Sequence, residues 1–156
     1  MNKVCIFDLD GTLTDTLESL TFSVNRALKE MGLGTVTSQQ CRQFVGNGAR
    51  VLMQKALKVS GDSCAERIDE AMQIYNRIFD QYCTYHVVPY EGIKEMLAEL
   101  KQKGFHLAVL SNKPHRQTIF VVEEIFGKDV FDLIQGQKED IPKKPDPTAA
   151  WQILKD

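Results

Sequence analysis

Near its amino terminus the sequence is Val4-Cys5-Ile6-Phe7-Asp8-Leu9-Asp10-Gly11-Thr12-Leu13. The first four residues form a short apolar run, which is typical of a strand buried on both faces of a parallel sheet. The run stops at a carboxylate, and a glycine follows soon after, which predicts a turn at the end of the strand. We therefore expect a buried first strand with two acidic side chains, Asp8 and Asp10, at its carboxyl end.

The second half of the chain alternates between helical periodicity and apolar runs. Helices are predicted near residues 91–103 and 115–126, and strands near residues 106–110 and 131–135. A last helix is predicted to begin with Asp146 as its N-cap and Pro147 as its first residue. Alternating strands and helices are the pattern of a parallel sheet. The predicted fold class is therefore α/β, with a Rossmann-like parallel sheet core that is incomplete at about three strands.

An insertion of four amphipathic helices separates the first strand from the rest of the α/β pattern. Apolar residues recur there at three- and four-residue steps. Gly32 is expected to end the first of these helices, and Thr37 with Gln40 has the spacing of a capping box that opens the second. The predicted domains are a discontinuous α/β core, residues 1–13 and 86–156, and an inserted helical bundle, residues 14–85.

Composition and charge exclude several classes of protein. The 156 residues carry 19 basic and 21 acidic side chains, a net charge of −2, so neither nucleic acid nor an anionic membrane is an expected partner. No apolar stretch approaches the roughly 18 residues of a membrane helix, and the start lacks the order of a secretory signal. The four cysteines (Cys5, Cys41, Cys64 and Cys83) lack CxxC pairing. This usage suits a reducing compartment, so we expect a cytoplasmic globular protein whose oligomeric state the sequence leaves open.

Reactive side chains follow each predicted strand. Asp8 and Asp10 end the first strand, Ser111 and Asn112 the second, and Lys144 lies in the loop after the third. Ligands of open α/β sheets bind outside the carboxyl ends of the strands, so these groups are expected to converge. An ionised carboxylate can attack phosphorus while its neighbour handles protons, and two acids suit Mg²⁺. Taken singly, the two acids also fit a turn, Ser111 and Asn112 a helix cap, and Lys144 a surface charge. Their joint order at successive strand ends favours a catalytic site.

Three motifs resemble those of the haloacid dehalogenase-like hydrolase superfamily of phosphohydrolases. They are Phe7-Asp8-Leu9-Asp10-Gly11-Thr12-Leu13, Val109-Leu110-Ser111-Asn112-Lys113-Pro114 and Lys144-Pro145-Asp146-Pro147. The helical insertion sits where that superfamily has a small α-helical cap. Within it, Phe44-Val45-Gly46-Asn47-Gly48-Ala49-Arg50-Val51-Leu52 resembles the phosphoglycolate phosphatase branch. The resemblance covers essentially the whole chain.

The resemblance implies a Mg²⁺-dependent phosphate monoester hydrolase that acts on a small phosphorylated metabolite, with phosphoglycolate the first to test. Asp8 would be the nucleophile that forms an aspartyl-phosphate, and Asp10 would act as general acid and then as general base. The Asp8 carboxylate and the Asp10 backbone carbonyl would ligate Mg²⁺. The implied phosphate-binding residues are Thr12, Ser111, Asn112 and Lys144. The implied substrate-binding residues of the cap are Gly46, Asn47, Gly48 and Arg50.

The family's fourth motif has no counterpart in the sequence. That motif is an acidic stretch that follows one more helix and strand and completes the Mg²⁺ site. Asp156 falls within the expected last helix and cannot replace it. Because the strand that leads to this motif is missing as well, the strand carrying Asp8 would keep an unpaired apolar edge. We therefore expect an incomplete phosphatase, arising from a shortened chain, a broken gene or an incomplete sequence.

Two other functions stay open at this point. A phosphosugar mutase would use the same aspartyl-phosphate, although the stretch at residues 44–52 points away from it. A catalytically inactive fragment that acts only by binding a partner is favoured by the missing fourth motif. Among single residues, Arg50 is equally consistent with a substrate ligand and a solvated arginine, Thr12 also fits a turn, and Lys113 is expected at the surface.

Overall fold

The computed structural model describes residues 3–62 and 65–155, so Cys64 and Asp156 lie outside the described residues. The chain forms two compact units: an α/β unit, Met1–Asp15 with Val88–Asp156, and a helical unit, Thr16–Val87. The predicted boundaries, 13/14 and 85/86, each fall two residues earlier. The difference arises because β2 (Thr14–Asp15) pairs antiparallel with β3 (Val88–Pro89), which keeps both connecting segments in the α/β unit.

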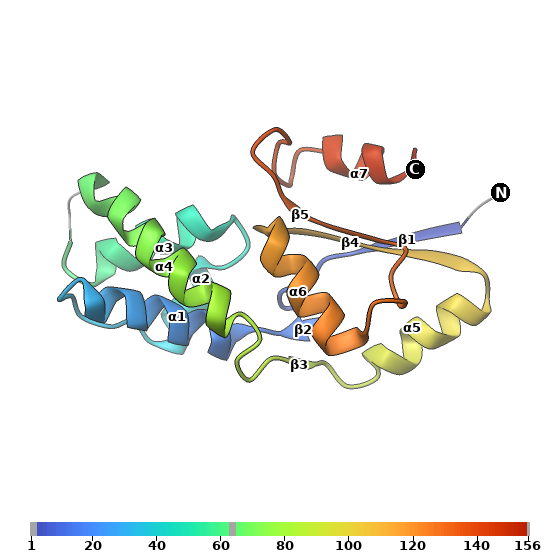
Figure 1. The fold of residues 1–156 in the computed structure, drawn as a ribbon, viewed down its shortest axis with the longest axis horizontal. Coiled ribbons are helices and arrows are strands. Elements are labelled where there is room, and N and C mark those ends of the chain that lie inside the picture. The colour runs from blue at the N-terminus through green and yellow to red at the C-terminus, as the bar shows by residue number, and fades with distance from the viewer. Residues whose placement is uncertain (1–2, 63–64, 156) are drawn as a thin grey trace. The chain divides into compact units, whose positions relative to one another are not determined.

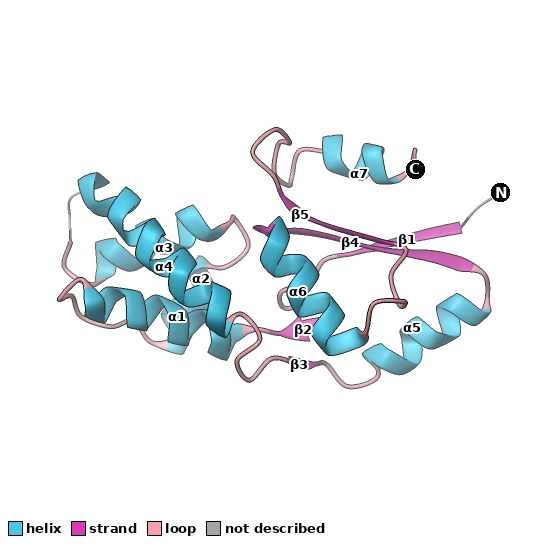
Figure 2. Cartoon of the chain, viewed as in Figure 1, coloured by secondary structure: helices cyan, strands magenta, loops and turns pink. Residues whose placement is uncertain are grey.

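The sheet of the α/β unit has three described strands that all run parallel. They are β1 (Lys3–Phe7), β4 (Phe105–Pro114) and β5 (Leu133–Gln137), in the order β1-β4-β5 (Figure 2). The central strand β4 is buried almost throughout, which explains the continuous apolar run at residues 107–110. Phe7 pairs with Val109, so the carboxyl end of β1 lies level with the following residues of β4. The predicted α/β class with a sheet of about three parallel strands is confirmed.

Three helices cover the two faces of this sheet. Figure 1 shows α5 (Ile93–Gln102) and α6 (His115–Phe126) on one face and α7 (Thr148–Ile153) on the other. Ala108 and Leu110 of β4 pack against α7, and the alternate residues Leu107 and Val109 are fully buried. Side chains alternate across a strand, so one short apolar run supplies both layers of the core. Each fully buried leucine or valine contributes roughly 1.5–3 kcal/mol to folding.

The predicted start of the last helix needs a small correction. Asp146 does not occupy the N-cap position itself, because the helix begins at Thr148 with Pro147 before it. The Asp146 carboxylate instead accepts a hydrogen bond of 2.9 Å from the backbone N–H of Thr148. Hydrogen bonds from Thr148 lower the pKa of Asp146. The side chain thus stabilises the helix start, as predicted, from one position farther away.

The helical unit contains α1 (Leu17–Glu30), α2 (Ser38–Phe44), α3 (Ala49–Val59) and α4 (Ile68–Tyr82), with a 3₁₀ turn at Ala65–Arg67. The predicted capping box is confirmed: Thr37 Oγ1 accepts from the Gln40 N–H, and Gln40 Oε1 accepts from the Thr37 N–H. Gly32, with φ of 73°, follows the end of α1 as predicted. Among residues 3–62 and 65–155, no helix is both long and apolar enough to cross a lipid bilayer.

Candidate active site

The two N-terminal acids lie on a tight turn that leads out of β1. The backbone oxygen of Leu9 accepts hydrogen bonds from the N–H groups of Thr12, Leu13 and Thr14, at 3.0–3.2 Å. Gly11 has φ of 77°, a conformation that a side chain would disfavour. Leu9 and Leu13 are fully buried, whereas the Asp8 side chain is 46% exposed. Leu9 is therefore anchored in the core, and the acids on either side of it lie at the carboxyl end of the strand, with Asp8 the more exposed of the two.

An irregularity in β4 presents the second motif. Leu110 pairs with Gln135 of β5, but the next pairing joins Pro114 to Gln137, so three residues of β4 face one residue of β5. Ser111, Asn112 and Lys113 leave the regular ladder at this bulge, yet all three are buried. The hydroxyl of Ser111 accepts a hydrogen bond of 3.2 Å from the Lys113 backbone N–H. The bulge thus places three polar residues directly after Leu110, in the carboxyl-terminal part of β4.

Asn112 fixes the loop that carries Lys144. Its side-chain Nδ2 donates to the Lys144 carbonyl at 3.0 Å, and its Oδ1 accepts from the Lys144 N–H at 2.8 Å. The Lys144 Nζ then reaches Oδ1 of Asp8 at 3.0 Å and the backbone oxygen of Leu110 at 2.7 Å. Both ends of the Asn112 amide are therefore used to place Lys144 beside Asp8.

Lys113 contradicts the expectation that it lies at the surface. Its side chain is only 2% exposed, and its Nζ lies 2.9 Å from Oδ1 of Asp10, whose side chain is 14% exposed. The sequence signal was its place beside Ser111 and Asn112 at a strand end, but the bulge that turns the side chain inward could not be anticipated. Each N-terminal carboxylate is thus matched by one lysine, Asp8 by Lys144 and Asp10 by Lys113.

The backbone behind Lys113 is tightly packed against β5. Thr118 donates from its hydroxyl to the Lys113 carbonyl at 3.1 Å, and the Gly136 N–H donates to Nδ1 of His115 at 3.1 Å. Burial, with a smaller contribution from the Lys138 charge, lowers the pKa of His115, which favours the neutral ring that this bond requires. These contacts hold the start of α6 against the strand.

Gly136 is the tightest point of this packing. A Cβ added there would lie 2.6 Å from both the His115 Cα and the Lys113 carbonyl oxygen. Because both atoms belong to the backbone, Gly136→Ala should lower the free energy of unfolding by about 1–3 kcal/mol, as overpacked cores do. Urea unfolding would measure this. Gly34→Ala is the matched control, since its Cβ would meet only the Ser60 oxygen at 3.6 Å and should leave stability almost unchanged; equal losses would contradict the packing argument.

The predicted cap residues belong to the helical unit. Gly46, Asn47 and Gly48 form the connection between α2 and α3, where Gly46 has φ of 115° and Gly48 has φ of 92°. Arg50 lies in the first turn of α3, is exposed, and forms an ion pair of 2.8 Å with Asp69 of α4. Its contact within the helical unit is therefore an acidic side chain, and its role toward a substrate stays a prediction.

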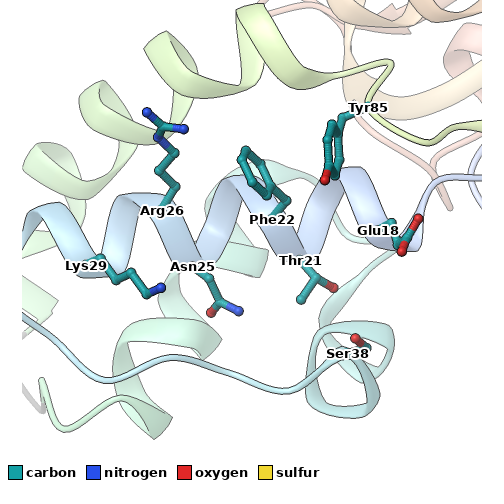
Figure 3. Close-up of a pocket in the computed structure, with 8 residues that line it drawn as sticks. All are labelled: Glu18, Thr21, Phe22, Asn25, Arg26, Lys29, Ser38 and Tyr85. Atoms are coloured by element: carbon teal, nitrogen blue, oxygen red, sulfur yellow. The ribbon is translucent and has the colours of Figure 1, made fainter.

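A cavity of about 560 Å³ lies along α1 within the helical unit (Figure 3). The rings of Phe22 and Tyr85 stack there with their centroids 4.6 Å apart, and the Arg26 guanidinium lies 5.8 Å from the Phe22 centroid. None of the described residues that line it is a predicted site residue. The cavity therefore does not mark the predicted phosphate site.

Thr12, Ser111 and the two acids are the remaining predicted site residues. Thr12 is exposed on the turn, and Ser111 is buried beside Lys113. Among the described residues, no cluster of three or more His, Cys, Asp or Glu side chains surrounds a potential metal position. Asp8 and Asp10 nevertheless supply the oxygen donors that suit Mg²⁺, which is often bound by one or two carboxylates together with water and phosphate. The residues present therefore fit this ion in donor chemistry.

Comparison with known proteins gives a consistent assignment. Residues 5–156 match the sequence profile of the haloacid dehalogenase-like hydrolase family. A phosphoglycolate phosphatase of Colwellia psychrerythraea is 35% identical over 162 residues, which cover 98% of this chain and 70% of that protein. One of Pseudomonas savastanoi is 34% identical over 156 residues, with 98% and 57% covered. The chain therefore spans between 57% and 70% of the length of these curated relatives.

The fold agrees with this sequence match. The crystal structure of a predicted phosphoglycolate phosphatase from Haemophilus somnus superposes with a TM-score of 0.91 at 26% identity, covering 99% of this chain and 71% of that one. Both the family profile and the superposition extend over almost the whole chain. The chain belongs to the haloacid dehalogenase-like hydrolase family.

Proposed function

We propose that this protein hydrolyses phosphate monoesters through a covalent intermediate on Asp8. The observation that carries the proposal is the pairing of two acids with two lysines at one strand end, Lys144 with Asp8 at 3.0 Å and Lys113 with Asp10 at 2.9 Å. An exposed carboxylate beside a cation can meet an anionic substrate without the repulsion that would otherwise keep the two apart. The relatives named phosphoglycolate phosphatase support the same activity.

The proposed reaction has two displacements at phosphorus. In the first, an oxygen of Asp8 attacks the phosphorus atom, the bond to the leaving oxygen breaks, and Asp10 donates a proton to the departing alcohol. In the second, a water molecule attacks the phosphorus of the aspartyl-phosphate while Asp10 accepts a proton from that water. The bond between Asp8 and phosphorus breaks, which releases inorganic phosphate and restores both carboxyl groups to their starting states.

The other residues at the strand ends hold the phosphoryl group in this scheme. Lys144, whose side chain is 30% exposed, would offset the charge of the phosphoryl oxygens. Ser111 and Thr12 carry hydroxyls that can donate hydrogen bonds to those oxygens. Asn112 acts indirectly, because its amide forms hydrogen bonds with both the carbonyl and the N–H of Lys144. We therefore assign Asn112 to the positioning of Lys144.

Magnesium is the proposed cofactor. The Asp8 carboxylate and the Asp10 backbone carbonyl would hold it, together with oxygens of the substrate. When bound, the ion supplies charge neutralisation at the phosphoryl oxygens and helps to align the substrate. Asp8 and Lys144 remain responsible for attack and for orientation.

The proposed substrate is a small phosphorylated metabolite of the phosphoglycolate type. Gly46, Asn47, Gly48 and Arg50 are the proposed contacts from the cap, where a guanidinium could bind the carboxylate of such a molecule. The described cysteines Cys5, Cys41 and Cys83 lie outside any disulfide, which supports the proposal of a reducing, cytoplasmic location.

Phosphate release from phosphoglycolate tests this proposal. We expect the purified protein to release phosphate when Mg²⁺ is present, to stop when a chelator removes it, and to recover when Mg²⁺ is restored. The assay is colorimetric phosphate detection, with p-nitrophenyl phosphate as a second substrate. A folded protein that turns over neither compound would contradict the proposal and favour a chain that acts only by binding a partner.

A further inference from the structure

We infer that Lys113 is a positioning residue that fixes the Asp10 carboxylate for proton transfer; this inference rests on the function proposed above. The two side chains are 2% and 14% exposed, and the ammonium lies 2.9 Å from Oδ1 of Asp10. A buried ammonium is strongly unfavourable unless a partner compensates the lost hydration. The close contact with Asp10 supplies such compensation, so the two side chains constrain one another.

The backbone of Lys113 is itself held in place. Its N–H donates to the hydroxyl of Ser111 at 3.2 Å, and its carbonyl accepts from the hydroxyl of Thr118 at 3.1 Å. Gly136 packs directly behind that carbonyl with no room for a side chain. Because the backbone of Lys113 is held in place and its ammonium contacts the Asp10 carboxylate, the Lys113 side chain has little conformational freedom. The pair can therefore hold Asp10 in one orientation before a substrate arrives.

The two lysines differ in what they can touch. Lys144 is 30% exposed and contacts Asp8, which is 46% exposed, so a ligand can reach both. Lys113 exposes almost no surface to a ligand and contacts the less exposed acid. We therefore expect Lys113 to act through Asp10. Because Lys113 bonds Oδ1, the second carboxylate oxygen is the one through which Asp10 would exchange a proton.

This placement predicts an unusual kinetic signature with p-nitrophenyl phosphate. Its leaving group is a stable anion that departs without protonation, so only the second displacement needs Asp10 to accept a proton. Without Lys113 the aspartyl-phosphate should form at a nearly normal rate and break down about ten- to a hundredfold more slowly, as misplaced catalytic groups do. The values of kcat and KM should then fall together while kcat/KM changes little.

The test compares Lys113→Met with Lys103→Met, which removes an exposed lysine of similar shape from the end of α5. Rapid mixing with p-nitrophenyl phosphate should give a burst of p-nitrophenolate, close to one per protein, in Lys113→Met alone. With an alkyl phosphate, whose leaving group needs a proton, kcat/KM should fall as well. In an Asp10→Asn background, Lys113→Met should add almost no further loss, because both changes act on the same carboxylate.

A structural role alone would give a different result. If Lys113→Met lowers kcat at unchanged KM without a burst, or behaves like Lys103→Met, the inference is overturned. The wild-type protein and Asp10→Asn give a second readout by ¹⁵N NMR, in which the Lys113 ammonium should exchange slowly with water only when Asp10 is intact. Fast exchange in the wild type would also overturn it. A wild type with no turnover would refute the proposed function, and the NMR comparison would still decide the pairing.

Discussion

Replacing the first acid with its amide, Asp8→Asn, should abolish phosphate release while the fold is retained. An amide oxygen is a poor nucleophile at phosphorus, and the substitution changes neither the size of the side chain nor its acceptor for the Leu9 N–H at 2.8 Å. Losses on the order of 10⁴- to 10⁶-fold in kcat are typical when an enzyme loses its nucleophile. The measurement is phosphate release under saturating substrate, and circular dichroism reports on the fold.

Asp129→Asn is the matched control for this change. Asp129 is exposed in the loop after α6, and Lys101 bonds its backbone carbonyl, so the amide should leave turnover unchanged. Equal activity in Asp8→Asn and Asp129→Asn would remove Asp8 from the reaction. Equal loss in both variants would point to a general effect of lost negative charge.

Lys144→Met should give the second largest loss of activity. The variant keeps the length of the side chain but removes the cation that contacts Asp8 at 3.0 Å and the Leu110 carbonyl at 2.7 Å. Removing one preorganised group that stabilises developing charge commonly lowers kcat by about 10²- to 10³-fold. Because the side chain is 30% exposed, we expect little change in the free energy of unfolding.

The control for Lys144→Met is Lys128→Met, which removes an exposed lysine from the loop after α6. Steady-state kinetics at several ionic strengths would compare the two variants, since a long-range surface charge is screened by salt and a direct contact much less. Unchanged kcat/KM in Lys144→Met at every ionic strength would show that the ammonium does not contact the reacting phosphoryl group.

Local patterns in the sequence predicted the elements of the fold well because those elements depend on neighbouring residues. The capping box at Thr37 and Gln40 forms both of its hydrogen bonds, and the apolar run at the start of the chain becomes β1. The prediction that this strand is buried was wrong, because β1 lies at the edge of the described sheet and is only partly buried. By contrast, β2 (Thr14–Asp15) and β3 (Val88–Pro89) were missed, because two residues are too short to show a period. Their pairing depends on segments far apart in the chain.

The candidate site, too, could be predicted from the sequence only in part. The order of the motifs along the chain was enough to predict that Lys144 and Asp8 would meet, although 136 residues separate them. The inward turn of Lys113 could not be predicted, because it follows from the bulge between Leu110 and Pro114. That bulge depends on the register with β5, which no local spacing in β4 records. The two hydrogen bonds between the Asn112 amide and the Lys144 backbone could not be predicted from local spacing either.

Trapping the covalent intermediate tests the central claim most directly. The protein would be mixed with substrate and Mg²⁺, quenched within milliseconds, and reduced with borohydride, which converts an aspartyl-phosphate to homoserine. Mass spectrometry of the N-terminal peptide should then find homoserine at position 8, and Asp8→Asn should yield none. Homoserine at position 10, or active protein that never acquires the modification, would contradict Asp8 as the nucleophile.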